Sequence, residues 1–89
     1  MPDAPDGEIV EETDDYVHVR FRDPDEFDTI RTPDWAENVA SDVAEGAEVR
    51  TGKLKDSGDW LVESVLIPAG TDHDEAESEA EEIVEKIES

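Results

Sequence analysis

The chain has 89 residues, of which 28 are Asp or Glu and 7 are Lys or Arg, so its formal charge is -21 at neutral pH. A chain of this length holds one small domain at most, which excludes a large multi-substrate enzyme. It contains no Cys, which excludes disulfides, thiolate metal sites and a cysteine nucleophile. No apolar run approaches the roughly 20 residues of a membrane helix, and residues 1–6 do not resemble a signal peptide, so we expect a cytoplasmic protein without membrane contact.

The excess negative charge has three interpretations: an acidic disordered segment, a mimic of nucleic acid, or a protein that works in molar salt. Disorder throughout is disfavoured, because two Trp, two Phe and the largely apolar run 61–67 are what a folded core needs. In molar salt the Debye length falls to roughly 3 Å, which screens the mutual repulsion of so many carboxylates. We therefore expect a halophilic protein with a non-specific atmosphere of counter-cations, and nucleic-acid mimicry is the lesser alternative.

The charges divide the chain into three parts. Residues 1–15 hold 7 acids and no base, residues 16–68 hold 12 acids and 6 bases, and residues 69–89 hold 9 acids and 1 base. We therefore predict a mobile acidic tail over 1–15, in which Ile9 and Val10 could add a short edge strand. The core domain is expected to span 16–68, and residues 69–89 to form a linker and an acidic amphipathic helix.

The core domain is predicted to begin with a strand over 16–22. Its period of two sends Val17, Val19 and Phe21 to one face, and Arg20 and Arg22 to the other. Residues 23–28 are rich in Pro and acids and are expected to form a loop.

A helix is predicted from about residue 33 to 45, with Thr32 as its N-cap and Gly46 in its C-terminal cap. Its apolar stripe consists of residues at helical spacing: Trp35, Ala36, Val39, Ala40 and Val43. Residues 47–54 and 60–67 are typical of two strands, joined by a turn.

These elements follow the order β-α-β-β. A right-handed crossover leaves the first two strands parallel, and the third then lies antiparallel between them. The sequence thus predicts an α+β fold with a three-stranded mixed sheet, one packed helix and an acidic C-terminal helix. The apolar stripe of that last helix is narrow and consists of Ala76, Ala80, Ile83, Val84 and Ile87. The helix therefore packs on the sheet of its own chain, meets a second copy of the chain, or frays.

Catalytic and metal-binding patterns are scarce. His18 and His73 have no spacing typical of a zinc site or a catalytic triad, and residues 72–75 (Asp-His-Asp-Glu) lack the fixed geometry that metal selectivity needs. The glycines are isolated, so no phosphate loop is indicated, and no Ser lies in a nucleophile-elbow context. We therefore predict no catalytic residue, no metal site and no cofactor, and an enzyme is disfavoured.

The basic side chains are the one non-random feature, because all of them except Lys86 fall in the core domain. Arginines kept in so acidic a chain could form a fork-shaped site for phosphate or carboxylate. The candidate ligand-binding residues are Arg20, Arg22, Arg31, Arg50 and Lys53. The favoured and simpler interpretation is that these bases form surface ion pairs with neighbouring acids such as Asp28, Glu48 and Glu63.

Residues 16–68 also carry a recognisable pattern. Its parts, in chain order, are Val19–Pro24, Phe27, Ile30–Ala36, Gly46–Arg50, Gly52–Lys53, Trp60 and Ser64–Pro68. The pattern resembles a family of small uncharacterised proteins of halophilic archaea and covers about 53 of 89 residues. The resemblance implies a molar-salt cytoplasm, and it implies no catalytic or binding residue because that family has no assigned function.

Three functions fit these observations. The first, which we favour, is a non-enzymatic protein-interaction module able to self-associate as a homodimer, since burying Trp60, Ile83 and Ile87 against a partner would help so small a core. The second is a module that binds nucleic acid or a phosphate ligand through an arginine-bearing sheet face. Molar salt weakens phosphate contacts, so stacking by Tyr16 or a Trp would have to supplement charge. The third is a small enzyme with an anionic substrate.

Overall fold

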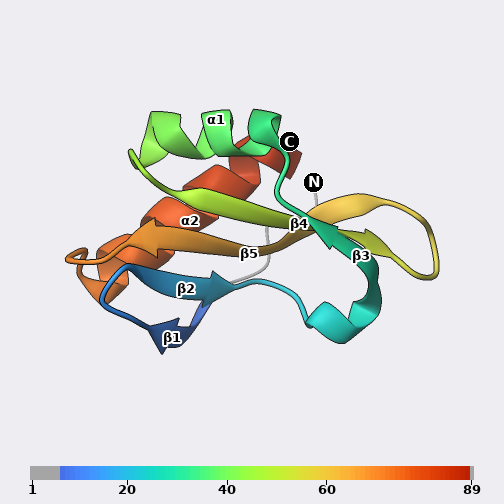
Figure 1. Cartoon of the computed structure of the whole chain (residues 1–89), viewed down its shortest axis with the longest axis horizontal. Coiled ribbons are helices and arrows are strands. Elements are labelled where there is room, and N and C mark those ends of the chain that lie inside the picture. Colours follow the sequence, from blue (N-terminus) through green and yellow to red (C-terminus); the bar gives the residue numbers. More distant parts are fainter. Residues whose placement is uncertain (1–6, 89) are drawn as a thin grey trace.

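A computed structural model describes residues 7–88, which form five strands, a short 3-10 helix and two α-helices (Figure 1). The elements are β1 (Glu8–Glu12), β2 (Tyr16–Arg20), η1 (Pro24–Glu26), β3 (Phe27–Arg31), α1 (Asp34–Val43), β4 (Glu48–Leu54), β5 (Trp60–Pro68) and α2 (His73–Glu88). Neither α-helix within residues 7–88 has the length and apolar character that a membrane crossing requires.

The five strands form one sheet in the order β1-β2-β5-β4-β3, and every neighbouring pair is antiparallel. The predicted α+β class is confirmed, and so is the antiparallel placement of β5 between β2 and β4. The sheet has five strands rather than three, however, and it is not mixed, because β2 and β4 run in the same direction without pairing with each other. Apolar residues on both faces of β5 suit its central position.

The two additional strands lie at the edges of the sheet. β1 belongs to the segment expected to be a tail, and it pairs with β2. Residues 1–6 of that expected tail lie outside the described residues. β3 begins at Phe27, within the expected loop. The Asp23 carboxylate caps η1 by accepting a hydrogen bond from the Asp25 amide at 2.9 Å, and η1 leads directly into β3.

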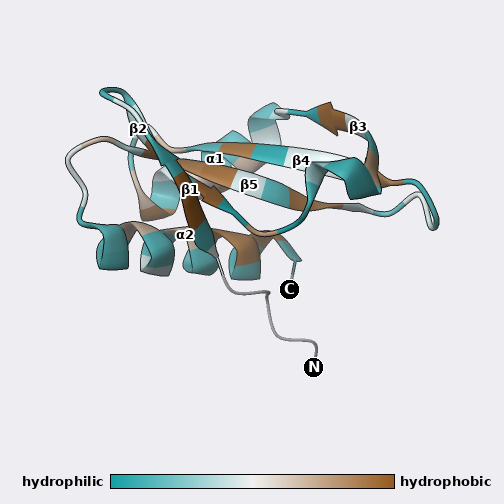
Figure 2. Ribbon diagram, turned by 90° about the horizontal axis from the view of Figure 1, so that it is seen from below, coloured by the Kyte–Doolittle hydropathy of each residue, from teal (hydrophilic) through white to brown (hydrophobic). Residues whose placement is uncertain are grey.

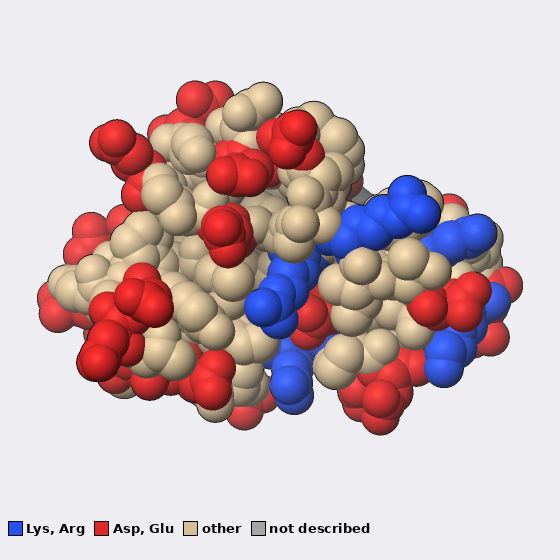
Figure 3. Space-filling model, viewed as in Figure 1, with Lys and Arg blue, Asp and Glu red and all other residues tan. Residues whose placement is uncertain are grey.

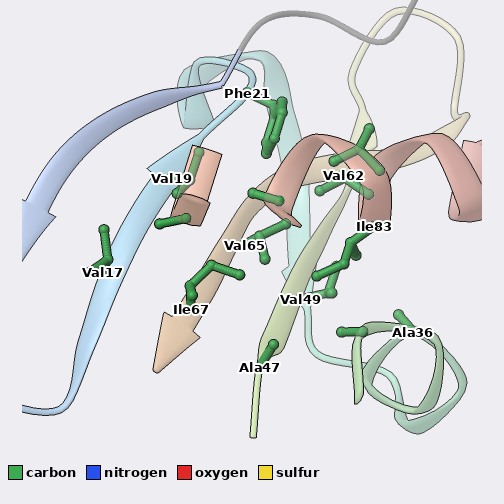
Figure 4. Close-up of a cluster of buried hydrophobic side chains, with 14 residues drawn as sticks. Val17, Val19, Phe21, Ala36, Ala47, Val49, Val62, Val65, Ile67 and Ile83 are labelled. Carbon is green, nitrogen blue, oxygen red and sulfur yellow. The ribbon is translucent and has the colours of Figure 1, made fainter. Parts of the chain in front are cut away.

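One face of the sheet carries both α-helices. α2 packs across β5, β2 and β1, and α1 packs beside α2 against β4 (Figures 1 and 2). The buried core between these layers consists of Val17, Val19, Phe21, Ala47, Val49, Val62, Val65 and Ile67 from the sheet side, and Ala36, Ala40, Ala76, Ala80, Ile83 and Val84 from the helices (Figure 4). The opposite face, called the open face below, is covered by neither α-helix.

The start of α1 differs from the prediction. Its N-cap is Pro33, which makes no side-chain cap hydrogen bond, so the expected Thr32 cap is wrong. Ala36 and Ala40 form the buried line of the helix, whereas Trp35 is 54 % exposed. Because successive helical residues are rotated by about 100°, the position before Ala36 points away from that line. Trp35 is therefore a surface residue and not part of the core stripe.

α2 packs on its own sheet, which is the first of the three predicted alternatives. Four residues of its stripe are fully buried there: Ala76, Ala80, Ile83 and Val84. At its C-terminal end the Glu88 carboxylate accepts hydrogen bonds from the Val62 amide at 2.9 Å and from both terminal nitrogens of Arg22 at 2.7 and 3.0 Å. The stripe therefore has no need of a second copy to cover it.

Candidate anion-binding site on the open sheet face

Strand register brings two arginines to the middle of the open face. Arg20 of β2 and Arg50 of β4 are both register partners of Ser64 in β5, so they flank it on the same face. Within residues 7–88 the guanidinium of Arg50 makes no hydrogen bond or ion pair. Pairing with neighbouring acids, the favoured interpretation of the sequence, therefore does not account for Arg50.

A β-bulge in β5 adds a carboxylate to this group. The register shifts just after Arg50, which leaves Glu63 as the extra residue of β5. The Glu63 side chain is only 4 % exposed. Its Oε1 accepts a hydrogen bond from the Ser64 hydroxyl at 2.8 Å, and its Oε2 lies 3.9 Å from Nε of Arg20. The expected ion pair with Glu63 thus forms, through Arg20, at the long end of the salt-bridge range.

Two nitrogen atoms here are buried without a hydrogen-bond partner in the described part of the chain: Nε2 of His18 and Nε of Arg20. Such a group costs about 1–3 kcal/mol unless water or a ligand completes it. Burial lowers the pKa of His18 below its ordinary 6.5; Glu63 and Glu11 oppose this shift, whereas Arg50 and Arg20 add to it. His18 is therefore mainly neutral at neutral pH.

These side chains belong to one cavity of about 390 Å³, called the Arg cavity below, which is lined by His18, Arg20, Pro24, Ile30, Arg31, Thr32, Arg50 and Glu63. Three arginines against one glutamate give the lining a net positive charge, although the whole chain carries -21. Figure 3 faces this side and shows Lys and Arg side chains, interspersed with Asp and Glu, on the half of the molecule that carries β3, whereas the other half displays Asp and Glu. The positive charge of the lining favours an anionic ligand.

Three of the five predicted ligand-binding residues thus meet at the Arg cavity: Arg20, Arg31 and Arg50. Lys53 does not line it. Its register partner in β5 is Trp60, three residues before the bulge.

Arg22 is also outside the Arg cavity, and the prediction that it shares a strand face with Arg20 is wrong. β2 ends at Arg20, and the amides of Phe21 and Arg22 both donate to the carbonyl oxygen of Glu63, at 2.9 and 3.2 Å, so the alternation stops. The Arg22 guanidinium instead joins Glu88 and the carbonyl of Val62. Arg22 is a structural residue.

A second cavity of about 330 Å³, called the Trp cavity below, is lined by Arg31, Pro33, Trp35, Thr51 and Trp60. The Arg31 guanidinium lies over the Trp60 ring, 5.6 Å from its centroid, as in a cation–π contact. Sequence reasoning missed this cavity, because the helical spacing of Trp35 assigned it to the core. The available signal was that both Trp of this polar chain lie within a few residues of a basic side chain, Trp35 after Arg31 and Trp60 after Lys55.

The other histidine is remote from both cavities. His73 at the start of α2 pairs with Glu12 of β1, with 3.1 Å between Nε2 and Oε1, and both side chains are exposed. Among residues 7–88 no three His, Asp or Glu side chains converge in a way that could hold a metal ion.

Comparison with known proteins adds no relative: no protein-family model, no curated protein and no solved structure matches this chain.

Proposed function

We propose that this chain is a non-enzymatic binding module that holds the phosphate or carboxylate group of a ligand in the Arg cavity. The observation that carries the proposal is the placement of Arg20 and Arg50 on either side of Ser64, in a positively charged cavity of an otherwise acidic molecule. Binding of nucleic acid or a phosphate ligand through an arginine-bearing sheet face is the second of the three functions that fit the sequence.

The chemistry of the lining favours an oxyanion. A planar guanidinium presents parallel N–H groups that match two oxygens of a phosphate or carboxylate, and such charge-assisted hydrogen bonds are about twice as strong as neutral ones. Among residues 7–88 the buried nitrogens of His18 and Arg20 find no hydrogen-bond partner, and a ligand oxygen could supply one. In molar salt, chloride ions compete with a ligand for each single arginine. A ligand with several oxygens can contact Arg20 and Arg50 together, so its affinity is reduced less by this competition.

One hydroxyl near the arginines is unsuited to catalysis. It belongs to Ser64, which lies between Arg20 and Arg50 in the strand register, is fully buried and donates to Glu63. A hydroxyl held in this way is not poised to attack a bound ligand.

We also propose that the protein works in the molar-salt cytoplasm of a halophile. The support is the charge of -21 and the resemblance of residues 16–68 to a family of halophilic archaea. Self-association remains a proposal with weaker support, because α2 already buries the stripe that would have needed a second copy.

Calorimetric titration of the full chain with inorganic phosphate in molar KCl tests the function. Removing one charge-assisted contact costs roughly 1.5–3 kcal/mol, so we expect Arg50→Gln to weaken binding by about tenfold or more. Lys53→Gln is the matched control, because it removes one positive charge from the same strand but lies outside the Arg cavity, and we expect it to change the affinity by less than about twofold. Equal losses in both variants, or no binding by the wild type, would refute the proposed site.

A further inference from the structure

Glu63 is the one acid among residues 7–88 that lines the Arg cavity, and its side chain is only 4 % exposed. The bulge in β5 brings it to the arginines, because Glu63 is the extra residue next to Ser64. A buried carboxylate beside arginines reduces the positive charge of the site, so it weakens binding of any anion whose oxygens are all acceptors. Glu63 thus opposes the proposed function unless the ligand makes use of it.

The two oxygens of the Glu63 carboxylate have different surroundings. Oε1 accepts a hydrogen bond from the Ser64 hydroxyl at 2.8 Å. Oε2 lies 3.9 Å from Nε of Arg20, which is too long for a hydrogen bond, and this Nε has no hydrogen-bond partner in the described part of the chain. Oε2 and the Arg20 guanidinium are therefore an acceptor and a donor that do not satisfy each other. The Arg20 side chain is 42 % exposed, so it can shift when a ligand binds.

An oxyanion that still carries a proton can satisfy both groups. One of its oxygens accepts from the Arg20 guanidinium, and its hydroxyl donates to Oε2 of Glu63. Inorganic phosphate keeps at least one proton throughout the physiological pH range, whereas sulfate carries none and a phosphate monoester loses its last proton with a pKa of about 6. Sulfate and the ionised monoester therefore present only acceptor oxygens to Glu63, and acceptor against acceptor is repulsive.

We infer that Glu63 makes the Arg cavity selective for inorganic phosphate, by accepting a hydrogen bond from the P–OH group while Arg20 and Arg50 bind the ionised oxygens. This inference rests on the proposed function and names its ligand. Size does not explain such a preference, because a cavity of about 390 Å³ admits sulfate and small phosphate esters equally well. The preference also persists in molar salt, because it arises from pairing a donor with an acceptor rather than from net charge.

The wild-type protein alone tests the selectivity. The full chain is titrated calorimetrically in molar KCl with inorganic phosphate, sulfate and methyl phosphate at about pH 8, where the monoester, with its pKa of about 6, is ionised and inorganic phosphate keeps one proton. All three anions are then mainly dianions of similar shape, so charge and size do not separate them. We expect inorganic phosphate to bind about tenfold or more tightly than either of the other two.

Glu63→Gln isolates the contribution of the carboxylate. It preserves the size of the side chain and an oxygen that can accept from Ser64, and its amide can donate to a ligand oxygen. We expect it to tighten binding of sulfate and methyl phosphate by about tenfold and to bring the three affinities within about twofold of one another.

Glu48→Gln is the matched control. Glu48 lies two residues from Arg50 on the same face of β4, but it does not line the Arg cavity. The control removes the same charge, so we expect it to leave the ratio of the phosphate and sulfate affinities unchanged. If Glu63→Gln does not fold, as judged by circular dichroism, the ratios measured on the wild type decide the matter.

The outcomes distinguish this inference from the proposed function. Equal affinities of the wild type for the three anions, or an unchanged ratio in folded Glu63→Gln, overturn the inference, while the anion site stands if Arg50→Gln still weakens binding. Tighter binding of sulfate than of phosphate would show that Glu63 donates a proton to the ligand, and it also overturns the inference. If none of the three anions binds, the proposed function fails as well.

Discussion

His18 lies on the open face among charges of both signs. Its imidazole is half-buried, and Glu63, Glu11, Arg50 and Arg20 all act on its protonation. Burial dominates and lowers its pKa, so the folded protein holds the His18 proton less tightly than the unfolded chain does.

The lowered pKa of His18 predicts a pH dependence of stability. Above pH 6.5 the imidazole is neutral in the folded and in the unfolded chain, so it has no effect on stability. As the pH falls from 6.5 through the lower pKa of the folded state, the unfolded chain takes up the proton first, and the free energy of unfolding decreases. Denaturant unfolding in molar KCl across this range should show the loss. We expect His18→Gln to reduce it, and His73→Gln, at an exposed position, to leave it in place. The reverse pattern would contradict the assignment.

Gly52 is the residue on which β3 depends. A Cβ at this position would lie 2.4 Å from Cγ of Phe27, because the Phe27 ring lies directly against the glycine. Overpacking of this kind typically costs about 1–3 kcal/mol. We therefore expect Gly52→Ala to lower the free energy of unfolding by about 2 kcal/mol, measured by denaturant titration. The double variant Gly52→Ala/Phe27→Leu should recover part of this loss, and full additivity of the two changes would argue against the contact.

At the scale of the elements, α2 is tied to the sheet at its last turn. Arg22 donates to Glu88 and to the carbonyl of Val62, and the Val62 amide donates to Glu88, so one carboxylate joins α2, β5 and the end of β2. The Arg22 and Glu88 side chains are 19 % and 17 % exposed, which limits solvent screening of the pair.

Loss of these hydrogen bonds between Arg22, Val62 and Glu88 should be measurable. Charged hydrogen bonds of this type contribute roughly 1.5–3 kcal/mol, so we expect Arg22→Ala to lower the free energy of unfolding by about 2 kcal/mol. Glu88→Gln should cost less, because the amide oxygen can still accept from Val62. Lys55→Ala, on the exposed turn after β4, is the control, and a loss as large as that of Arg22→Ala would show that any basic residue has this effect.

Elements with a clear hydrophobic period could be predicted from the sequence, and this holds for β2, α1, β4, β5 and α2. β3 could not, because Phe27–Arg31 follows a Pro- and Asp-rich segment and is stabilised by pairing with β4. That pairing depends on space that Gly52 provides in another strand. Such a contact between distant residues leaves no local pattern.

The candidate site was predictable in residue type but not in geometry. The retained arginines had two interpretations, surface ion pairs, which was favoured, and an anion site, and three of these arginines line the Arg cavity. The period of two misplaced Arg22, because it cannot show that β2 ends at Arg20. The bulge at Glu63 and the exposure of Trp35 also follow from tertiary packing rather than from local sequence.

At the scale of the whole molecule, the acidic surface should make stability depend on salt. The pKa of Glu79 on α2 is raised by its partial burial and by the neighbouring Glu75 and Glu82, so folding costs more free energy when Glu79 is ionised than when it is protonated. The chain carries -21 in total, and repulsion of this kind is screened only at high ionic strength.

We therefore expect the melting temperature, followed by circular dichroism, to fall steadily as KCl is lowered from molar to millimolar concentration. Tetramethylammonium chloride at equal ionic strength should protect as well as KCl if screening is the cause, and clearly poorer protection would show that specific cations are needed instead. Glu79→Gln should raise the melting temperature more at low salt than at high salt, because it removes one of the repelling charges.

The central position of β5 has a consequence for synthesis on the ribosome. β5 pairs with both β2 and β4, yet it follows both of them along the chain. Until β5 emerges, the nascent chain can form only two separate antiparallel strand pairs, the hairpin of β1 with β2 and the pair of β3 with β4 that α1 connects, each with an unpaired inner edge. The pairing of β5 with β2, which is distant in sequence, forms slowly. The translating chain therefore depends on its own negative charge, or on a chaperone, to keep these two strand pairs from associating with other chains until β5 arrives.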